Sequence, residues 1–221
     1  MGFLDNVFGN KMKPGASGMA NSAKDFYTAV KDRRTYYGIS KEAPVSDERI
    51  KEVIDHAVKY TPSAFNSQSA RVVLLLGEHH NKLWDITKET LRKIVPADRF
   101  ASTEEKINNS FRSGYGTVLF FEDERVIQGL QQQFPSYAKN FPIWAHQSSG
   151  MLQYVIWTSL EIEGFGASLQ HYNPLIDDEV KREWNIPNEW TLIAQMPFGK
   201  PITTPGDKEF KPLEERVKFF K

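Results

Sequence analysis

Apolar side chains recur every three or four residues over several stretches of the chain, which is the period of an α-helix with one buried face. The clearest example is residues 46–60, where Ser46 stands at the position of a helix N-cap. The apolar face of this stretch consists of Ile50, Val53, Ile54, Ala57 and Val58. The same pattern predicts further helices over residues 23–34, 80–95, 103–113, 124–134, 143–163 and 175–186.

Two uninterrupted apolar runs have the length of a strand, "ARVVLLLGE" at 70–78 and "GTVLFFED" at 116–123. Because even and odd positions are both apolar, each run is expected to be buried on both faces of a sheet. Segments 164–172 and 189–201 supply further strands. Helices around such a sheet indicate an α+β fold with a mixed central sheet of about four or five strands.

The chain of 221 residues, 40% of them hydrophobic, is long enough to bury one full core. Residues 1–23 are rich in glycine and lack a sustained apolar period, so we expect a flexible leader there and a single domain over 24–221. The last segment, 202–221, carries apolar side chains at irregular spacing after a Pro-Gly turn. Such a tail needs a surface that buries it, and a neighbouring subunit is one candidate.

Composition narrows the range of partners. Lys and Arg together number 28, as do Asp and Glu, so no global field favours nucleic acid or an anionic membrane. The absence of cysteine excludes disulfides, thiolate metal sites and a cysteine nucleophile. No secretory signal is recognisable, and His146, Gln153 and Glu161 oppose a membrane span in the longest apolar helix. These features indicate a cytoplasmic protein that binds neither nucleic acid nor membrane.

Several familiar catalytic patterns are incomplete. In "GFGASL", Leu169 stands where a dinucleotide fingerprint has its third glycine, and the segment opens a strand instead of a helix. Adjacent His79 and His80 point about 100° apart on a helix, and no acidic or histidine partner completes a metal site. No serine stands in the context of a nucleophile elbow. Metal and serine-hydrolase chemistry are therefore not expected.

Four polar clusters remain: "DRRTYY" at 32–37, "PSAFNSQSAR" at 62–71, "GFGASLQHY" at 164–172, and the lysines near the C-terminus. Each has a purely structural explanation. Paired arginines complement a helix C-terminus, the second cluster suits a turn with capping residues, two glycines suit a helix stop and a bulge, and tail lysines suit a solvated surface.

Taken together, in this order and spacing, the clusters resemble the nitroreductase family of FMN-dependent oxidoreductases, and within it the small bacterial and fungal nitroreductases. The resemblance runs from about residue 24 to the end of the chain and rests on "RRTYYG", "TPSAFNSQSAR" and "GFGASLQHYN". It implies a homodimer with two FMN sites at the interface and a C-terminal tail exchanged between subunits.

The resemblance also implies which residues bind the cofactor. Arg33 and Arg34 match the basic pair that binds the FMN phosphate and the pyrimidine edge of the ring, and Thr35 replaces a common serine. The loop that reaches the flavin from the partner subunit is matched by Ser63, Ala64, Asn66 and Gln68, with alanine where a second serine is common.

The segment beside the flavin N5 atom is matched by Leu169, Gln170 and His171. Lys200 and Lys211 lie near the family's basic C-terminal positions, with Lys208 as a competitor for that role. No protein side chain is required as a nucleophile, because the flavin carries the chemistry. The aromatic residues that we expect to wall a pocket for flat substrates, or else to pack in the core, are Phe65, Phe134, Tyr137, Phe141 and Trp144.

The expected activity is transfer of a hydride from NADH or NADPH, through the flavin, to nitroaromatic or related acceptors. Two alternatives stay open. One is a quinone or flavin reductase of the same family, and the other is a flavin-binding redox sensor without significant turnover. The sequence does not distinguish NADH from NADPH or identify the physiological acceptor.

Overall fold

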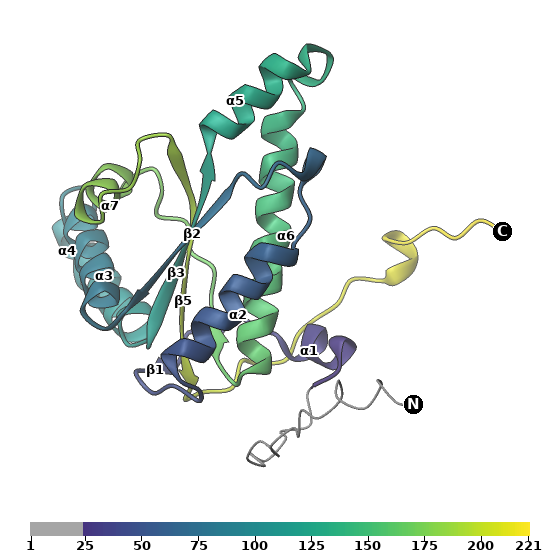
Figure 1. The fold of residues 1–221 in the computed structure, drawn as a ribbon. Helices are drawn as coiled ribbons and strands as arrows, with labels where there is room; N and C mark the ends of the chain where they lie inside the picture. The colour runs from purple at the N-terminus through teal and green to yellow at the C-terminus, as the bar shows by residue number, and fades with distance from the viewer. Residues whose placement is uncertain (1–23) are drawn as a thin grey trace, which may run out of the picture.

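The structure, a computed structural model, describes residues 24–221 and confirms an α+β architecture in which helices flank a five-stranded sheet (Figure 1). The expected leader, 1–23, lies outside the described residues. The helices are α1 (Phe26–Asp32), α2 (Asp47–Tyr60), α3 (Gly77–Arg92), α4 (Ala97–Ile107), α5 (Glu124–Gln133), α6 (Phe141–Ile162) and α7 (Asp177–Glu183). The strands are β1 (Ile39–Ser40), β2 (Ala70–Leu76), β3 (Gly116–Asp123), β4 (Gly166–Ala167) and β5 (Trp190–Pro201).

The sheet has the strand order β1-β5-β3-β2, and β4 pairs with the far end of β5. All of these ladders are antiparallel, so the expected mixed sheet is parallel only at an isolated bridge between Thr35 and Ala167. Within residues 24–221 no helix is long and apolar enough to cross a membrane.

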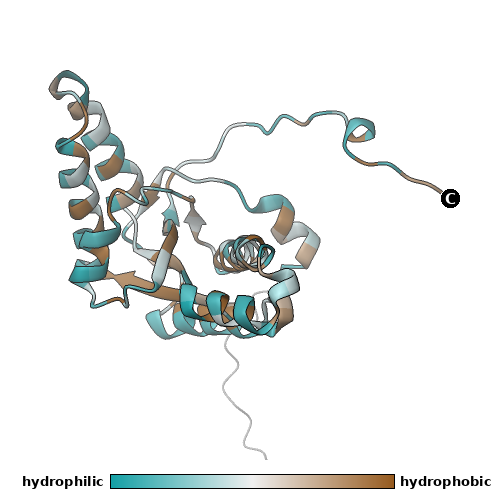
Figure 2. Cartoon of the chain, turned by 90° about the horizontal axis from the view of Figure 1, so that it is seen from above, coloured by the Kyte–Doolittle hydropathy of each residue, from teal (hydrophilic) through white to brown (hydrophobic). Residues whose placement is uncertain are grey.

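Two apolar cores lie on opposite faces of the sheet. On one face, α2 and α6 pack on β3 and β5 through residues that include Ile54, Ile156 and Phe120. On the other face, α3, α4 and α7 cover the same strands, with Trp84 and Phe121 at the centre. Figure 2 shows the hydrophobic strands between the helices and the C-terminal tail reaching away from them.

The two apolar runs have different environments. Strand β3 is buried along its whole length, as predicted. The prediction is wrong for β2, where Leu75 is buried and the other residues are only partly so. The reason is topological, because β2 is an edge strand and its open edge has no neighbour within the described chain.

Local signals placed most helices correctly. The Ser46 side chain accepts a hydrogen bond from the backbone N–H of Arg49 at 3.3 Å and caps α2, as predicted. Val58, expected on the buried face, is 41% exposed. The helix expected over 103–113 instead begins at Ala97 and continues as a π-helical turn over Asn108–Arg112. Segment 164–172 forms only the two-residue strand β4 and an isolated bridge beyond it.

Candidate functional site

The arginine pair closes helix α1. Arg33 is the C-cap residue, and its guanidinium carbon lies 4.4 Å from the ring centroid of Trp157 on α6. Its Nε atom is buried and has no hydrogen-bond partner among the described residues. Arg34 donates a hydrogen bond from Nη2 to the carbonyl oxygen of Gly206 at 2.6 Å. Neither guanidinium forms an ion pair within residues 24–221.

The Gly-x-Gly segment lies directly against the residues that follow these arginines. Thr35 bridges to Ala167, and the backbone N–H of Tyr36 donates to the carbonyl oxygen of Ala167 at 2.9 Å. A side chain at Gly166 would place its Cβ 2.7 Å from a ring carbon of Tyr36. Glycine therefore allows the close approach of these two segments. Gly164, at φ +88°, ends α6 as expected of a helix stop.

Residues 168–172 continue along β5. Gln170 and the fully buried Gln195 exchange backbone hydrogen bonds of 2.7 and 2.9 Å, and the Gln195 side chain accepts from the backbone N–H of Tyr172 at 2.7 Å. Leu169 and Gln170 are half-buried, whereas His171 is exposed. These hydrogen bonds hold the backbone of residues 170–172 along β5.

The candidate lysines are not brought together by the described chain. Lys200, opposite Ser40 in the sheet, forms an exposed ion pair with Glu42 at 2.6 Å. Lys208 lies 5.3 Å from the ring centroid of Phe210, and Lys211 is exposed in the tail that leaves the body of the protein. A contact between any of the three and a phosphate therefore stays a prediction.

The loop over residues 63–68 adopts an unusual backbone. Phe65, Asn66 and Gln68 have φ angles of 56°, 50° and 48°, although none of them is glycine. This conformation costs about 1–2 kcal/mol for a residue such as Phe65 or Gln68, and less for asparagine, whose short polar side chain tolerates it. The backbone N–H of Gln68 donates to the Ser63 hydroxyl at 3.0 Å, which closes the loop on itself. Because these residues carry side chains, no sequence pattern announced this conformation.

This loop and the arginine pair lie at different levels of α6. Phe65 stacks on Trp144, with ring centroids 5.9 Å apart, whereas Arg33 lies over Trp157. Thirteen residues of α-helix separate the two tryptophans, which corresponds to about 20 Å along the axis. The structure therefore does not unite the loop with the arginine pair of its own chain.

The five aromatic residues named from the sequence do come together. The Phe65 ring lies 5.0 Å from Phe134, 5.9 Å from Tyr137 and 5.3 Å from Phe141, in addition to its contact with Trp144. Phe65 itself is 51% exposed. The cluster joins the loop to α5 and to the start of α6, and it presents an aromatic surface to solvent.

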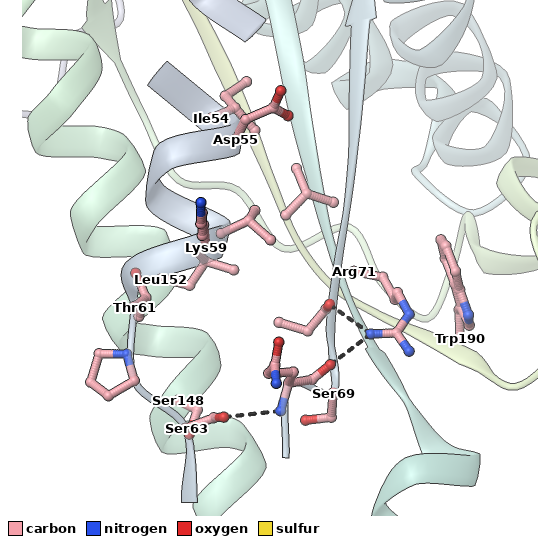
Figure 3. A pocket seen from close by; sticks show the side chains of 15 residues that line it. Ile54, Asp55, Lys59, Thr61, Ser63, Ser69, Arg71, Ser148, Leu152 and Trp190 are labelled. Atoms are coloured by element: carbon pink, nitrogen blue, oxygen red, sulfur yellow. Dashed lines mark hydrogen bonds between the residues drawn. The ribbon is translucent and has the colours of Figure 1, made fainter. Parts of the chain in front are cut away.

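A cavity of about 540 Å³ opens beside the loop, between the end of α2, strand β2 and α6 (Figure 3). Lys59 and Arg71 line it, together with the hydroxyl-bearing residues Ser63 and Ser148. The Arg71 guanidinium carbon lies 5.6 Å from the ring centroid of Trp190, which closes one side. In the single chain, Ser63 and Gln68 of the loop thus face an open cavity that charges of both signs line, because Asp55 lies there as well.

A buried carboxyl beneath the loop was missed from the sequence. Glu122, at the end of β3, is 1% exposed, and its Oε2 accepts a hydrogen bond from the Ser69 hydroxyl at 2.6 Å. Burial is the main cause that raises the pKa of Glu122 to about 7. The only sequence signal is a glutamate that directly follows the apolar run of β3.

The histidine pair has structural partners. His80 is buried, with Nδ1 2.9 Å from the Thr117 hydroxyl, and burial lowers its pKa to about 4. His79 Nδ1 accepts a hydrogen bond from the Trp184 indole at 3.2 Å. Within residues 24–221, neither histidine belongs to a group of three or more metal-ligating residue types.

Comparisons with known proteins agree with this geometry. The model of the nitroreductase family matches residues 30–200. The putative nitroreductase HBN1 of Saccharomyces cerevisiae is 38% identical over 180 residues, which cover 80% of this chain and 89% of that protein. The chain belongs to the nitroreductase family.

Solved structures give the same result. Nitroreductase CinD from Lactococcus lactis, in complex with chloramphenicol, superposes with a TM-score of 0.82 at 39% identity, covering 89% of this chain and all of that one. CinD has also been solved with 4-nitrophenol. A putative nitroreductase from Desulfovibrio desulfuricans, solved in complex with FMN, shares the fold at 18% identity and a TM-score of 0.64, covering 88% and 96% of the two chains.

Proposed function

We propose that this protein is an FMN-dependent oxidoreductase that works as a homodimer and uses NADH or NADPH to reduce nitroaromatic or related acceptors. The observation that carries this proposal is the pair of guanidinium groups that have no ion-pair partner among residues 24–221 and lie beside the tightly packed Gly166–Ala167 segment. The chemistry that FMN supplies is hydride transfer through its N5 atom. The protein contributes binding, orientation and charge.

The residues present fit this cofactor. A phosphate needs charge-assisted donors, and Arg33 and Arg34 offer planar forks of N–H groups, one of which includes a buried Nε that no described residue satisfies. The segment Leu169–His171, held along β5, offers backbone groups for the edge of the flavin ring. Thr35 lies between the two, at the bridge to Ala167. One phosphate and one flat ring can be held by this set.

A second subunit would explain the position of the loop over residues 63–68, which lies far from the arginine pair of its own chain. The loop with Ser63, Ala64, Asn66 and Gln68 lies about 20 Å along α6 from the arginine pair. We therefore assign the loop to the cofactor site that it forms with the partner's arginine pair. Small hydroxyl, methyl and amide side chains allow such a loop to approach a flat ring and to hydrogen-bond its polar edge.

The C-terminal tail supports the same assembly. Its apolar side chains are largely exposed in the single chain, and they are Phe210, Leu213, Val217, Phe219 and Phe220. The open edge of β2 and the partly exposed face beside α2 are equally unpartnered among residues 24–221. Exchange of tails between subunits would bury both kinds of surface. The tail would also carry Lys208 and Lys211 to the partner.

The aromatic cluster around Phe65 supports the proposed acceptor class. A flat, electron-poor ring suits a site with aromatic side chains on one side. The CinD complexes with chloramphenicol and 4-nitrophenol support nitroaromatic acceptors for a relative at about 40% identity. Quinones are flat as well, and a quinone or flavin reductase would use the same surface.

One experiment tests the cofactor, the donor and the turnover together. The protein is saturated with FMN, freed of unbound flavin, and titrated with NADH or NADPH without oxygen while the visible absorption is followed. We expect the flavin band to bleach with at least one donor and to return when chloramphenicol is added. Failure to retain FMN refutes the proposal. Bleaching without recovery by any nitroaromatic or quinone favours the redox sensor.

A further inference from the structure

The loop over residues 63–68 must be held in its conformation by contacts outside it. Three left-handed residues without glycine represent a few kcal/mol of backbone strain, which persists only where the surroundings enforce it. At one end, the ring of Phe65 is fixed among four aromatic side chains. The other end is fixed by a different set of contacts.

That other end is tied to the end of β3. The Ser69 hydroxyl donates to Glu122 Oε2 at 2.6 Å, and both residues are 1% exposed. The Ser69 carbonyl oxygen accepts from the backbone N–H of Asp123 at 3.0 Å. Arg71 donates to the carbonyl oxygen of Gln68 at 2.8 Å and to Asp123 Oδ2 at 3.1 Å. The residue that ends the loop is thus connected to β3 by side-chain and backbone bonds.

Burial of the Glu122 carboxyl is energetically unfavourable, so a role in stabilising the fold alone does not account for it. Its Oε1 atom is buried and has no hydrogen-bond partner among the described residues. An unpaired buried carboxyl oxygen destabilises a fold, and an apolar side chain would avoid that cost. A role for the carboxyl in shaping the loop would explain its presence.

We propose that Ser69 and Glu122 are positioning residues, which hold the loop over residues 63–68 in the shape that binds flavin. This inference rests on the proposed function, because it assumes that the loop contacts FMN. Neither residue touches the cofactor in this proposal. The hydrogen bond acts through the backbone of Gln68 and the strained turn before it.

The proposal has a pH dependence with a defined sign. In the held state the pKa of Glu122 is about 7, mainly because of burial, whereas a released loop would expose the carboxyl and return the pKa towards 4.5. The neutral carboxyl therefore favours the held state, and ionisation as pH rises through 7 favours release.

The charges around Glu122 come from several elements. Glu124 and Asp123 raise its pKa, and Arg71 on β2 lowers it. On α6, the side chains of Ser148, Ser149 and Gln153 are buried and carry no charge, and His146 is exposed. On α2, Asp55 and Lys59 line the cavity beside the loop. Of these carboxyls, Glu122 is the one whose pKa is raised to about 7.

The test measures FMN dissociation constants by quenching of flavin fluorescence, at pH 6 and pH 8.5, for the full-length protein. The variants are Ser69→Ala and Glu122→Gln, and the controls are Ser102→Ala and Glu105→Gln on α4, far from the loop. We expect Ser69→Ala to raise the dissociation constant about three- to tenfold at pH 6.

For Glu122→Gln, the pH profile is the decisive readout. Between pH 6 and pH 8.5, the FMN dissociation constant of the wild type should rise by a larger factor than that of Glu122→Gln. Because the phosphate of FMN titrates in the same way with both proteins, this comparison removes its effect. The controls should follow the wild type. Ser69→Ala decides alone if Glu122→Gln does not fold, as judged by circular dichroism.

Two results overturn the proposal in distinguishable ways. Wild-type affinity and an unchanged pH profile in both Ser69→Ala and Glu122→Gln, while Arg33→Ala still weakens FMN binding, would show that the positioning role is wrong and that the proposed FMN site stands. A wild-type protein that binds no FMN at either pH would refute the proposed function and this inference together.

Discussion

Arg34 donates a hydrogen bond of 2.6 Å to the carbonyl oxygen of Gly206, 172 residues further along the chain. A second hydrogen bond joins the same two segments of the chain, because the backbone N–H of Ile202 donates to the carbonyl oxygen of Gly38 at 3.0 Å. Beyond Gly206 the tail has few contacts and exposes its aromatic residues. The arginine pair and the start of the tail are therefore parts of one local structure.

Replacing Arg33 with alanine should weaken FMN binding by roughly 10- to 150-fold, because a charge-assisted hydrogen bond contributes about 1.5–3 kcal/mol. Part of the loss would come from the packing of the guanidinium on Trp157. Fluorescence titration with FMN gives the dissociation constant. Lys31→Ala, an exposed cation on the same helix, is the control. Equal affinities for the wild type and Arg33→Ala would contradict the assignment.

Deleting residues 210–221 should separate the subunits or cause aggregation, with loss of bound flavin. The physical reason is that the tail is not buried by the described part of its own chain, residues 24–221, where Phe219 and Phe220 are 84% and 90% exposed. Light scattering after size-exclusion chromatography gives the mass, and absorbance gives the flavin content. Lys218→Ala, which removes charge but no apolar surface, is the control. A stable monomer with one FMN per chain would disprove the shared site.

Residues with local determinants were predictable. Ser46 and the apolar spacing after it defined α2, and the apolar spacing before the paired arginines defined α1, of which Arg33 is the C-cap residue. Interactions between segments that are distant in the sequence were not predictable. The edge position of β2 depends on which strand pairs with it, and the Ser69–Glu122 hydrogen bond joins residues 53 positions apart. The left-handed backbone at Phe65 was hidden for another reason, since no glycine marks it.

Gly166→Ala should destabilise the protein by about 1–3 kcal/mol and weaken FMN binding, because the added Cβ would lie 2.7 Å from the Tyr36 ring and 3.0 Å from Pro201. Urea denaturation and flavin titration measure the two effects. Gly129→Ala on α5 is the matched control, since no atom lies within 4 Å of its new Cβ. That control should be neutral or gain up to about 1 kcal/mol. Equal stabilities of the two variants would refute the close-packing argument.

Phe65 combines a strained backbone with ring contacts, and two substitutions separate these contributions. Both Phe65→Ala and Phe65→Gly remove the ring that contacts Phe134 and Trp144. Only glycine adopts φ 56° without penalty, so Phe65→Gly should be more stable than Phe65→Ala by roughly 1 kcal/mol. Urea denaturation of both variants tests this difference. The opposite order would mean that the loop relaxes out of the left-handed region once the ring is gone.

Two buried titratable groups should oppose each other in the pH dependence of stability. His80 has a folded pKa of about 4 against an ordinary value of 6.5, so the stability it contributes is present above pH 6.5 and is lost as pH falls to 4. Glu122 has a folded pKa of about 7 against 4.5, so its contribution is present below pH 4.5 and is lost as pH rises through 7. Each contributes up to roughly 3 kcal/mol over its window.

Because the two windows overlap, the wild type should show little change in its free energy of unfolding between pH 4.5 and 6.5. Glu122→Gln should remove one slope and leave the other, so its stability relative to the wild type should rise with pH and be greatest above pH 7. His80→Gln should show the reverse trend, falling as pH rises. Urea denaturation at pH 4.5, 5.5, 6.5 and 7.5 measures all three proteins, with Glu105→Gln as the control. Parallel pH profiles for the wild type and Glu122→Gln would show that the carboxyl is ionised normally in the folded protein, and the environment assigned to it beneath the loop would then be wrong.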